Sequence, residues 1–325
     1  MTERFLILGG ARFHGLQLAE LLAGAGKEVF VLNRGNYKPF YDHGIRLLKA
    51  NRNDPGQMRS SLKGLNFDAV IDNNAYTPAQ IEAVLDLLQG RCGHYIFTST
   101  AAVYMALSSD RKLREDETQG VTDNAYSPMV RGYALNKLAA EETLRHKAQG
   151  LDYTILRLPN IFGAGDFLGK LSFFYYRIKD SGKVLLEKEV DRFSLVFVKD
   201  AVRVMAAVIG NKECFGMTIN VADPVAYTYE QFFSTVFGGF FFPNSMILLP
   251  AKDAWDAGYF LPLAWGPMID TSLLQDVLDC IDFTPLSAWG KDSLEWELGN
   301  FGDRMKDPDF ARRREYELTL IERFI

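Results

Sequence analysis

The sequence predicts an α/β protein in which helices cover both faces of a doubly wound, parallel β-sheet. Short apolar runs alternate with helical patterns through the first half of the chain, and a glycine-rich segment joins the first run to the first helical pattern. The second half loses this alternation. Strands that alternate with helices need crossover connections, which give a parallel sheet. We expect the sheet domain in residues 1–158, joined by returning segments of the second half, and a smaller C-terminal substrate lobe mainly in residues 159–325.

The expected elements follow one another in a regular order. Apolar runs that predict strands lie at residues 5–8, 29–32, 45–48, 68–72, 95–98 and 153–157. Apolar residues at helical spacing predict helices over residues 16–23, 78–88 and 131–147. Later strands are expected at residues 195–198 and 218–221, with a helix at 200–209 between them. An aromatic stretch then covers residues 237–267, and a charged helical region follows it. The aromatic run at 237–242 is suited to line an apolar pocket or, more commonly, to build core.

The composition is that of an ordinary globular protein. The 325 residues have a formal net charge of −5, with 48% hydrophobic and 24% charged residues. Mild acidity disfavours a general electrostatic hold on nucleic acid or on a membrane surface. No apolar run is long enough to span a bilayer, and the first residues lack a signal-peptide pattern, so we expect a cytoplasmic protein. The three cysteines and four histidines are scattered, and we expect no metal site.

The glycine-rich segment predicts a phosphate-binding loop. Glycine lets the backbone turn tightly and approach a pyrophosphate, while the N-terminus of the next helix supplies amide hydrogens. Arg12 replaces the middle glycine of the usual spacing, and its guanidinium is suited to cover a phosphate, with a solvated side chain as the alternative. The residues that we assign to a nicotinamide dinucleotide here are Gly9, Ala11, Arg12, Phe13 and Gly15.

The end of the second strand bears on the choice between the two nicotinamide dinucleotides. NAD-binding chains usually place an acidic residue there for the ribose hydroxyls, whereas an arginine suits the 2′-phosphate of NADP. Asn33 and Arg34 occupy this place. We assign both to the cofactor and expect NADP, with NAD as the alternative.

A tyrosine and a lysine one helical turn apart form the expected catalytic pair. Tyr133 and Lys137 share one helix face. A phenol has a pKa of about 10, and a neighbouring ammonium favours the phenolate. We therefore expect Lys137 to lower the pKa of Tyr133, so that Tyr133 exchanges a proton with a hydroxyl or carbonyl while the cofactor exchanges a hydride. Lys137 is also suited to bind the nicotinamide ribose. Thr100, with Ser99 as the alternative, supplies a hydroxyl that orients the substrate oxygen.

These residues resemble the extended short-chain dehydrogenase/reductases, the nucleotide-sugar epimerase/dehydratase superfamily with a Rossmann fold. Residues 9–15 resemble the phosphate loop of the family, and Tyr133 and Lys137 resemble its Tyr-x-x-x-Lys pair. The arginine in the loop is similar to an atypical branch that includes bacterial epimerase-like proteins and chloroplast stem-loop RNA-binding proteins. The resemblance implies that NAD(P) is the cofactor and that the protein forms a homodimer through two helices.

The resemblance also implies further site residues. It assigns Asn74 and Ala75 to the cofactor, and Asn51 with Arg52 takes the place of an acid that contacts adenine. The residues that it assigns to the substrate are Tyr76, Ala101, Asn160 and Arg192. Dehydratases of this family carry an Asp-Glu pair where this chain has Ala101 and Ala102, so dehydration is not expected.

Three functions stay open from the sequence. The first is an epimerase of a nucleotide-linked sugar, which regenerates its cofactor in each cycle. The second is an NADP-dependent reductase or dehydrogenase of a sugar or natural-product ketone, which Asn33 and Arg34 favour. The third is a relative that binds nucleotide or RNA without catalysis, which the net charge of −5 disfavours. A small-molecule substrate is the expected partner, with neither nucleic acid nor membrane.

Overall fold

The protein is described here by a computed structural model. The structure describes residues 2–36, 44–104, 111–118, 128–257, 267–278 and 281–324. Parts of the expected aromatic stretch, residues 258–266, lie outside the described residues. Within the described residues, no helix is both long and apolar enough to cross a membrane.

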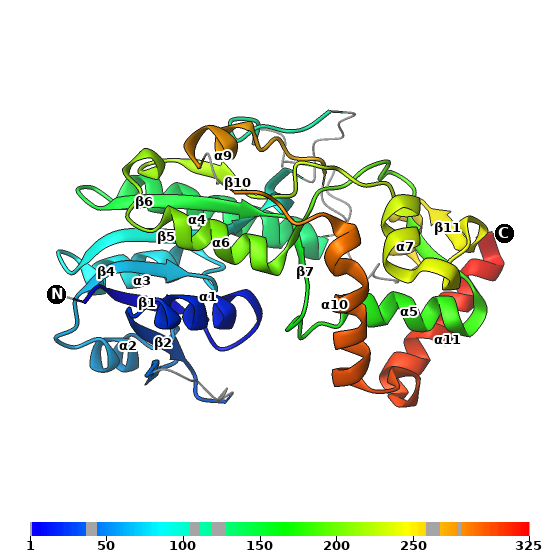
Figure 1. Cartoon of the computed structure of the whole chain (residues 1–325), viewed down its shortest axis with the longest axis horizontal. Coiled ribbons are helices and arrows are strands. Elements are labelled where there is room, and N and C mark those ends of the chain that lie inside the picture. Colours follow the sequence, from blue (N-terminus) through cyan, green and yellow to red (C-terminus); the bar gives the residue numbers. More distant parts are fainter. Residues whose placement is uncertain are drawn as a thin grey trace.

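A seven-stranded parallel sheet forms the first part of the molecule (Figure 1). Its spatial order is β10-β6-β5-β4-β1-β2-β3, and every neighbouring pair is parallel. Its strands are β1 (Arg4–Leu8), β2 (Glu28–Asn33), β3 (Arg46–Lys49), β4 (Phe67–Asp72), β5 (Cys92–Thr100), β6 (Asp152–Leu158) and β10 (Thr218–Asn220). The order reverses between β1 and β4, so the predicted doubly wound sheet is confirmed.

Helices cover both faces of the sheet. They are α1 (Phe13–Gly24), α2 (Pro55–Ser61), α3 (Pro78–Leu88), α4 (Pro128–Lys147) and α6 (Val198–Val208). The side chains of β1 alternate between the two faces: Ile7 enters a core with Leu18 and Met205, and Leu8 enters another with Ile81. Burial on both faces explains why the strand sequences are apolar throughout.

A lobe of helices lies beside the sheet, at the right of Figure 1. Its longer helices are α5 (Lys170–Ser181), α7 (Tyr229–Phe237), α10 (Leu286–Phe301) and α11 (Pro308–Phe324). Its strands β8 (Val184–Glu187) and β11 (Met246–Leu249) pair in parallel. Short helices α8 (Ala251–Asp256) and α9 (Ser272–Val277) complete the second half. We use the name C-terminal lobe for α5, α7, α10 and α11 with β8 and β11.

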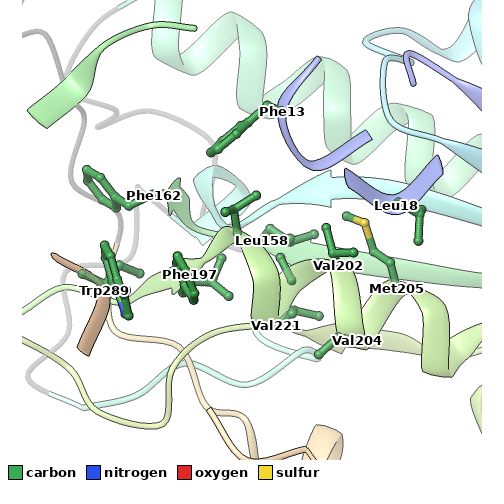
Figure 2. Packing of buried hydrophobic residues seen from close by; sticks show 14 of the residues in the cluster. Phe13, Leu18, Leu158, Phe162, Phe197, Val202, Val204, Met205, Val221 and Trp289 are labelled. Carbon is green, nitrogen blue, oxygen red and sulfur yellow. The ribbon is translucent and has the colours of Figure 1, made fainter. Parts of the chain in front are cut away.

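The connection between sheet and lobe is a second small sheet. It pairs β7 (Asn160–Phe162) with β9 (Leu195–Phe197), so the run expected at 195–198 joins this pair rather than the large sheet. The Phe197 ring stacks on Trp289 of α10, with centroids 5.0 Å apart and planes 7° apart. Figure 2 shows that the same apolar cluster continues to Val202 and Met205 of α6. One shared core therefore fixes the lobe against the sheet.

The aromatic run at 237–242 builds core and surface instead of lining the cavity described below. Phe237 and Phe241 are buried, whereas Phe240 and Phe242 are more than 60% exposed. None of these four side chains is among the described residues that line the cavity. The expectation of core is therefore the one that the structure favours.

Candidate functional site

A cavity of about 690 Å³ lies where the carboxyl ends of the central strands face the C-terminal lobe. The register places the ends of β1, β2 and β4 side by side, and β5 ends opposite β6. Polar residues from the sheet side line the cavity: His14, Asn73, Thr98, Thr100, Tyr133 and Lys137. Residues from the other side include Asn160, Lys170, Phe173, Arg304, Phe310 and Arg313. Ligands of doubly wound sheets bind at this edge.

The phosphate loop is too tight for side chains at its glycines. Gly9 has φ +85°, a conformation that favours glycine. A Cβ on Gly15 would lie 2.4 Å from the Gly9 carbonyl oxygen, and one on Gly10 would lie 2.9 Å from Val31. The glycines thus let the loop pack closely against the first strands and the first turn of α1, whose backbone amides are the groups that bind a pyrophosphate in such folds. Ala11 and Phe13 beside them are buried.

Arg12 lies on the surface next to the C-terminal lobe. Its guanidinium lies 5.2 Å from the centroid of the Phe167 ring, and Phe167 belongs to the loop before α5. The two loops face each other across the site. The contact places a cation at the phosphate loop and joins the two halves of the molecule through a cation–π interaction.

The end of β2 presents polar groups that have no acid beside them. The Asn33 Oδ1 accepts a hydrogen bond from the Gly35 amide at 2.6 Å. Its Nδ2 is buried and has no hydrogen-bond partner within the described residues. Arg34 is exposed next to it. The pair therefore offers an amide donor and a solvated cation at the place expected for the adenosine ribose.

Arg52, which the resemblance assigns to the cofactor, is bound to other groups of the protein in this structure. Its guanidinium donates two hydrogen bonds of 2.8 Å to the Asp72 carboxylate at the end of β4, and it also contacts the Asn74 side chain. The arginine is thus committed to a buried ion pair, which lowers the pKa of Asp72. Asn51 remains exposed at the expected edge, and Ala75 is fully buried beneath it in the core.

Thr100, Tyr133 and Lys137 meet in the cavity as the sequence predicts. Helix α4 places Tyr133 and Lys137 one turn apart, and Thr100 ends β5. The phenol of Tyr133 is hydrogen-bonded to Thr100, whose hydroxyl oxygen also accepts from the Ala102 amide at 3.1 Å. A hydroxyl and a phenol thus face one cavity, as proton exchange with a substrate oxygen requires.

The expected effect of Lys137 on Tyr133 is not what the structure shows. Burial raises the pKa of the Tyr133 phenol to about 12, against the hydrogen bond with Thr100. The Lys137 ammonium instead donates to the Thr98 carbonyl at 2.8 Å and lies 4.7 Å from the Phe97 ring centroid. Burial lowers the pKa of Lys137 to about 8. The lysine is therefore held against the strand end, and the phenol stays protonated in this state.

A buried polar network behind the site was not predicted. Ser99, the alternative to Thr100, donates to Glu141 at 2.5 Å and so points away from Tyr133. Glu141 also forms a two-point ion pair with Arg157, at 3.0 and 2.6 Å. Arg157 in turn donates to the Tyr104 hydroxyl at 2.7 Å. Because Glu141 lies one helical turn after Lys137, this network fixes α4 against β5 and β6. Ser99 still lines the cavity, but its hydroxyl is engaged by Glu141.

Of the four residues predicted to bind the substrate, three line the cavity and one does not. Tyr76, Ala101 and Asn160 line the cavity. The ring of Tyr76 is half exposed, and its centroid lies 6.2 Å from that of Tyr133. Arg192 is not among the described lining residues, because its guanidinium lies at the surface and donates to the Ala226 carbonyl at 3.2 Å. The structure therefore does not bring Arg192 to the site.

Sequence reasoning missed the lining residues from distant parts of the chain. Lys170 forms a 2.5 Å ion pair with Asp166, and both line the cavity. Arg304 and Arg313 reach it from the loop before α11 and from α11 itself. No spacing in the sequence connects these residues to the strand ends. His14 lies within the phosphate loop and Asn73 directly precedes Asn74, and only their polar character in an apolar setting could have singled them out.

The fold and the loop define a Rossmann-type α/β protein whose ligand edge faces a helical lobe. The chain belongs to the NAD dependent epimerase/dehydratase family, whose profile matches residues 5–222. The predicted relationship to the extended short-chain dehydrogenase/reductases is therefore confirmed.

Named relatives share part of the sequence. The chain is 27% identical over 242 residues to the chloroplast stem-loop binding protein of 41 kDa b of Arabidopsis thaliana, a match that spans 70% of this chain and 61% of that relative. It is 24% identical over 285 residues to 2′-dehydrokanamycin reductase of Streptomyces kanamyceticus, covering 84% and 78%. The fold is also that of UDP-glucose 4-epimerase from Bifidobacterium longum in complex with NAD⁺ and UDP, with TM-score 0.71, 17% identity and coverage of 91% and 98%.

Proposed function

We propose that the protein is an NAD(P)-dependent enzyme that inverts a carbinol of a nucleotide-linked sugar. The observation that carries the proposal is the meeting of Thr100, Tyr133 and Lys137 in one cavity at the ligand edge of the sheet. Family membership and the likeness to a UDP-glucose 4-epimerase support it. The nicotinamide of a bound cofactor would accept a hydride from the sugar and return it.

The chain has the features that a dinucleotide needs. A Cβ on Gly15 would lie 2.4 Å from the Gly9 carbonyl oxygen, so this glycine keeps the phosphate loop close to the N-terminus of α1, where backbone amides would bind a diphosphate. The buried Nδ2 of Asn33 lacks a partner within the described residues, and a ribose oxygen would provide one. The ammonium of Lys137 has three donors, and one of them binds Thr98. We infer that Lys137 directs another to the nicotinamide ribose.

The proposed proton path runs through the phenol. Tyr133 takes the proton of the substrate hydroxyl when the carbinol is oxidised and returns it when the ketone is reduced on the other face. Thr100 orients the substrate oxygen through its hydroxyl. A pKa of about 12 keeps the phenol protonated in the resting site, and a positive nicotinamide ring beside it would lower that pKa. Ala101 and Ala102 line the cavity at the two positions where dehydratases of this family carry an acidic pair, so we do not include dehydration.

One assay tests this function. The protein is incubated with UDP-glucose or UDP-galactose and oxidised cofactor, and the sugar products are separated. We expect the epimer to form without net accumulation of reduced cofactor, and we expect Tyr133→Phe to abolish it. Absence of any epimer across UDP- and dTDP-linked hexoses would contradict the proposal.

A second candidate is an NADP-dependent ketoreductase. Arg34 at the end of β2 favours it, as does the similarity to 2′-dehydrokanamycin reductase. Here the same residues act, and Tyr133 donates the proton to a ketone. Steady consumption of NADPH with a sugar-derived ketone, and no inversion of sugar nucleotides, would identify this function instead.

A further inference from the structure

A histidine lies in the floor of the cavity, where its ring contacts that of Phe13 with centroids 5.7 Å apart. His14 belongs to the first turn of α1 and lines the cavity with Thr98 and Lys137. Both of its ring nitrogens are buried, and neither has a hydrogen-bond partner within the described residues. A buried polar group without a partner costs about 1–3 kcal/mol. An arrangement of this kind is explained when a ligand completes it.

A second unpartnered donor lies in the same floor. The Asn73 Oδ1 accepts a hydrogen bond from the Thr98 hydroxyl at 2.6 Å, which fixes the orientation of the carboxamide. The other end, Nδ2, is buried and has no partner among the residues that the structure describes. It lies 3.2 Å from where a Cβ of Gly15 would be. Asn73 thus adjoins the phosphate loop, and the unpartnered donors of His14 and Asn73 form one polar floor.

The charge state of His14 determines what the floor presents. Burial, together with the nearby ammonium groups of Lys170 and Lys137, lowers the pKa of His14 to about 4. The imidazole is therefore neutral near pH 7, with one donor and one acceptor nitrogen. The Asn73 amide adds donors only. Together they match hydroxyl groups, which donate and accept, and phosphoryl oxygens, which accept.

A second buried histidine shows that this arrangement is particular to the cavity. Burial also lowers the pKa of His94 to about 4. Its Nε2 lies 3.0 Å from the Thr154 hydroxyl, and its Nδ1 accepts from the Gly210 amide at 3.2 Å. A structural histidine of this protein is thus satisfied at both nitrogens, whereas the one in the cavity is satisfied at neither.

We propose that His14 and Asn73 hydrogen-bond the ribose and phosphate oxygens of a dinucleotide bound at the phosphate loop. This inference rests on the proposed function, because it needs the chain to bind NAD(P). The cofactor is favoured over the sugar substrate because His14 lies in the loop-to-helix turn itself, directly before Gly15. Phe13, with φ +48°, turns the backbone into the left-handed region immediately before His14. Such strain in a non-glycine residue occurs where a side chain must be aimed at a ligand.

The test measures binding and stability together. Purified wild type and His14→Leu are titrated with NADP⁺ and NAD⁺ by calorimetry, and the melting temperature is recorded without ligand. We expect the leucine to weaken binding of the preferred dinucleotide about tenfold, as loss of one well-made hydrogen bond does. We also expect the melting temperature to stay equal or to rise, because an unsatisfied polar group has been removed. A purely structural histidine would give the opposite pair of results.

Three further variants sharpen the outcome. His14→Gln keeps a donor and an acceptor and should bind nearly as wild type. Asn73→Asp exchanges the donor for an oxygen of similar shape and should weaken binding. His94→Leu is the matched control, which should lower the melting temperature and leave the dissociation constant unchanged. Should His14→Leu fail to fold, His14→Ala takes its place.

The failures of the two proposals are distinguishable. If wild type binds neither dinucleotide, the proposed function fails and the inference with it. If wild type binds and His14→Leu binds equally well, the inference alone is overturned. Titration with UDP is the remaining arm: weaker UDP binding with unchanged dinucleotide binding would assign the floor to the substrate and overturn the assignment to the cofactor.

Discussion

The two walls of the cavity are built in different ways, although a buried Arg–Glu pair supports each of them. Behind the sheet wall, Arg157 and Glu141 are 16 positions apart and bind at 2.6 Å. In the wall of the C-terminal lobe, Arg177 lines the cavity and binds Glu317, 140 positions away, also at 2.6 Å. All four side chains are at most 1% exposed. The sheet wall therefore forms from neighbouring elements, whereas the lobe wall needs distant parts of the chain to meet.

This difference assigns separate tasks to the walls. The sheet wall holds the hydroxyl, phenol and ammonium that we expect to act on the substrate. The lobe wall supplies charged and aromatic side chains, among them Arg304 and Phe310, that suit recognition of a charged substrate. Chemistry should thus depend on the first wall, and substrate affinity on the second.

The largest effect should come from removing the phenol of the sheet wall. Tyr133→Phe should lower kcat about 10²- to 10⁴-fold, because general acid–base catalysis of that size is lost. Cofactor binding and the unfolding free energy should change little. The matched change on the lobe side is Tyr176→Phe, whose hydroxyl donates to the Gly302 carbonyl at 2.7 Å. It should cost about 1 kcal/mol of stability and leave kcat near wild type. Equal losses of kcat in both variants would erase the distinction between the walls.

Breaking the two ion pairs comes next in size. Glu317→Gln leaves Arg177 buried without its carboxylate, and Glu141→Gln does the same to Arg157. Each should lower the unfolding free energy by about 3–5 kcal/mol in denaturant titrations. The two variants should differ in function. Glu317→Gln should raise KM for the sugar nucleotide and retain the dinucleotide affinity. Glu141→Gln should in addition reduce kcat, because Glu141 anchors the helix that carries Lys137. Identical kinetic profiles would contradict separate walls.

The phosphate loop gives a smaller effect with a close control. Gly15→Ala places a Cβ 2.4 Å from the Gly9 carbonyl oxygen, so the loop must shift, at a cost of about 1–3 kcal/mol. Because the shifted loop no longer fits the phosphates, the affinity for the dinucleotide should also fall. Gly24→Ala, at the other end of α1, meets no atom within 4 Å and should stabilise the helix by about 0.5–1 kcal/mol with unchanged binding. Calorimetric titration of both variants checks the pair.

The same contrast explains how much the sequence could predict. Strands of the sheet and the positions of Thr100, Tyr133 and Lys137 follow from local patterns, because the carboxyl ends of parallel strands meet at one edge. The periodicity placed α3 at the bounds that the structure has, Pro78–Leu88. The pairing of β8 with β11 joins segments some sixty positions apart, and no local pattern announces it.

Some contacts of the site residues have physical causes that one sequence hides. The sequence gives no sign that Asp72, at the end of β4, binds the guanidinium of Arg52. Lys137 was expected to lower the pKa of Tyr133, but the Thr98 carbonyl holds its ammonium. Both are competitions between partners brought together only by the fold. The roles assigned to the site residues themselves stay predictions, and the variants above test them.

The titration of one buried carboxyl group should make the stability contributed by the lobe wall fall as the pH rises. Glu297 of α10 is fully buried and accepts from the Ser172 amide at 2.6 Å, and burial raises its pKa from 4.5 to about 7. Between pH 4.5 and about 7 the folded state binds more protons than the unfolded chain, so its contribution to stability is lost as the pH rises through this range. Glu297→Gln should remove that slope and gain on the order of 2 kcal/mol relative to wild type above pH 7. Denaturant titrations at pH 5 and pH 8 compare the two; parallel pH profiles would contradict the assignment.

The smallest expected effect concerns the choice of cofactor at the far end of the sheet wall. Arg34 is exposed at the end of β2, beside the unpartnered amide of Asn33. If its guanidinium binds the 2′-phosphate of NADP, Arg34→Ala should weaken NADP⁺ binding about fivefold, since a solvated charge contact contributes about 1 kcal/mol, and should leave NAD⁺ binding unchanged. Raising the salt concentration should reduce the difference between the NADP⁺ and NAD⁺ affinities of the wild type, because salt screens exposed charges, and should not change this difference in the variant. Tighter binding of NAD⁺ than of NADP⁺ by wild type would show that Asn33 alone serves the ribose, and the sheet wall would then select its cofactor without a charge.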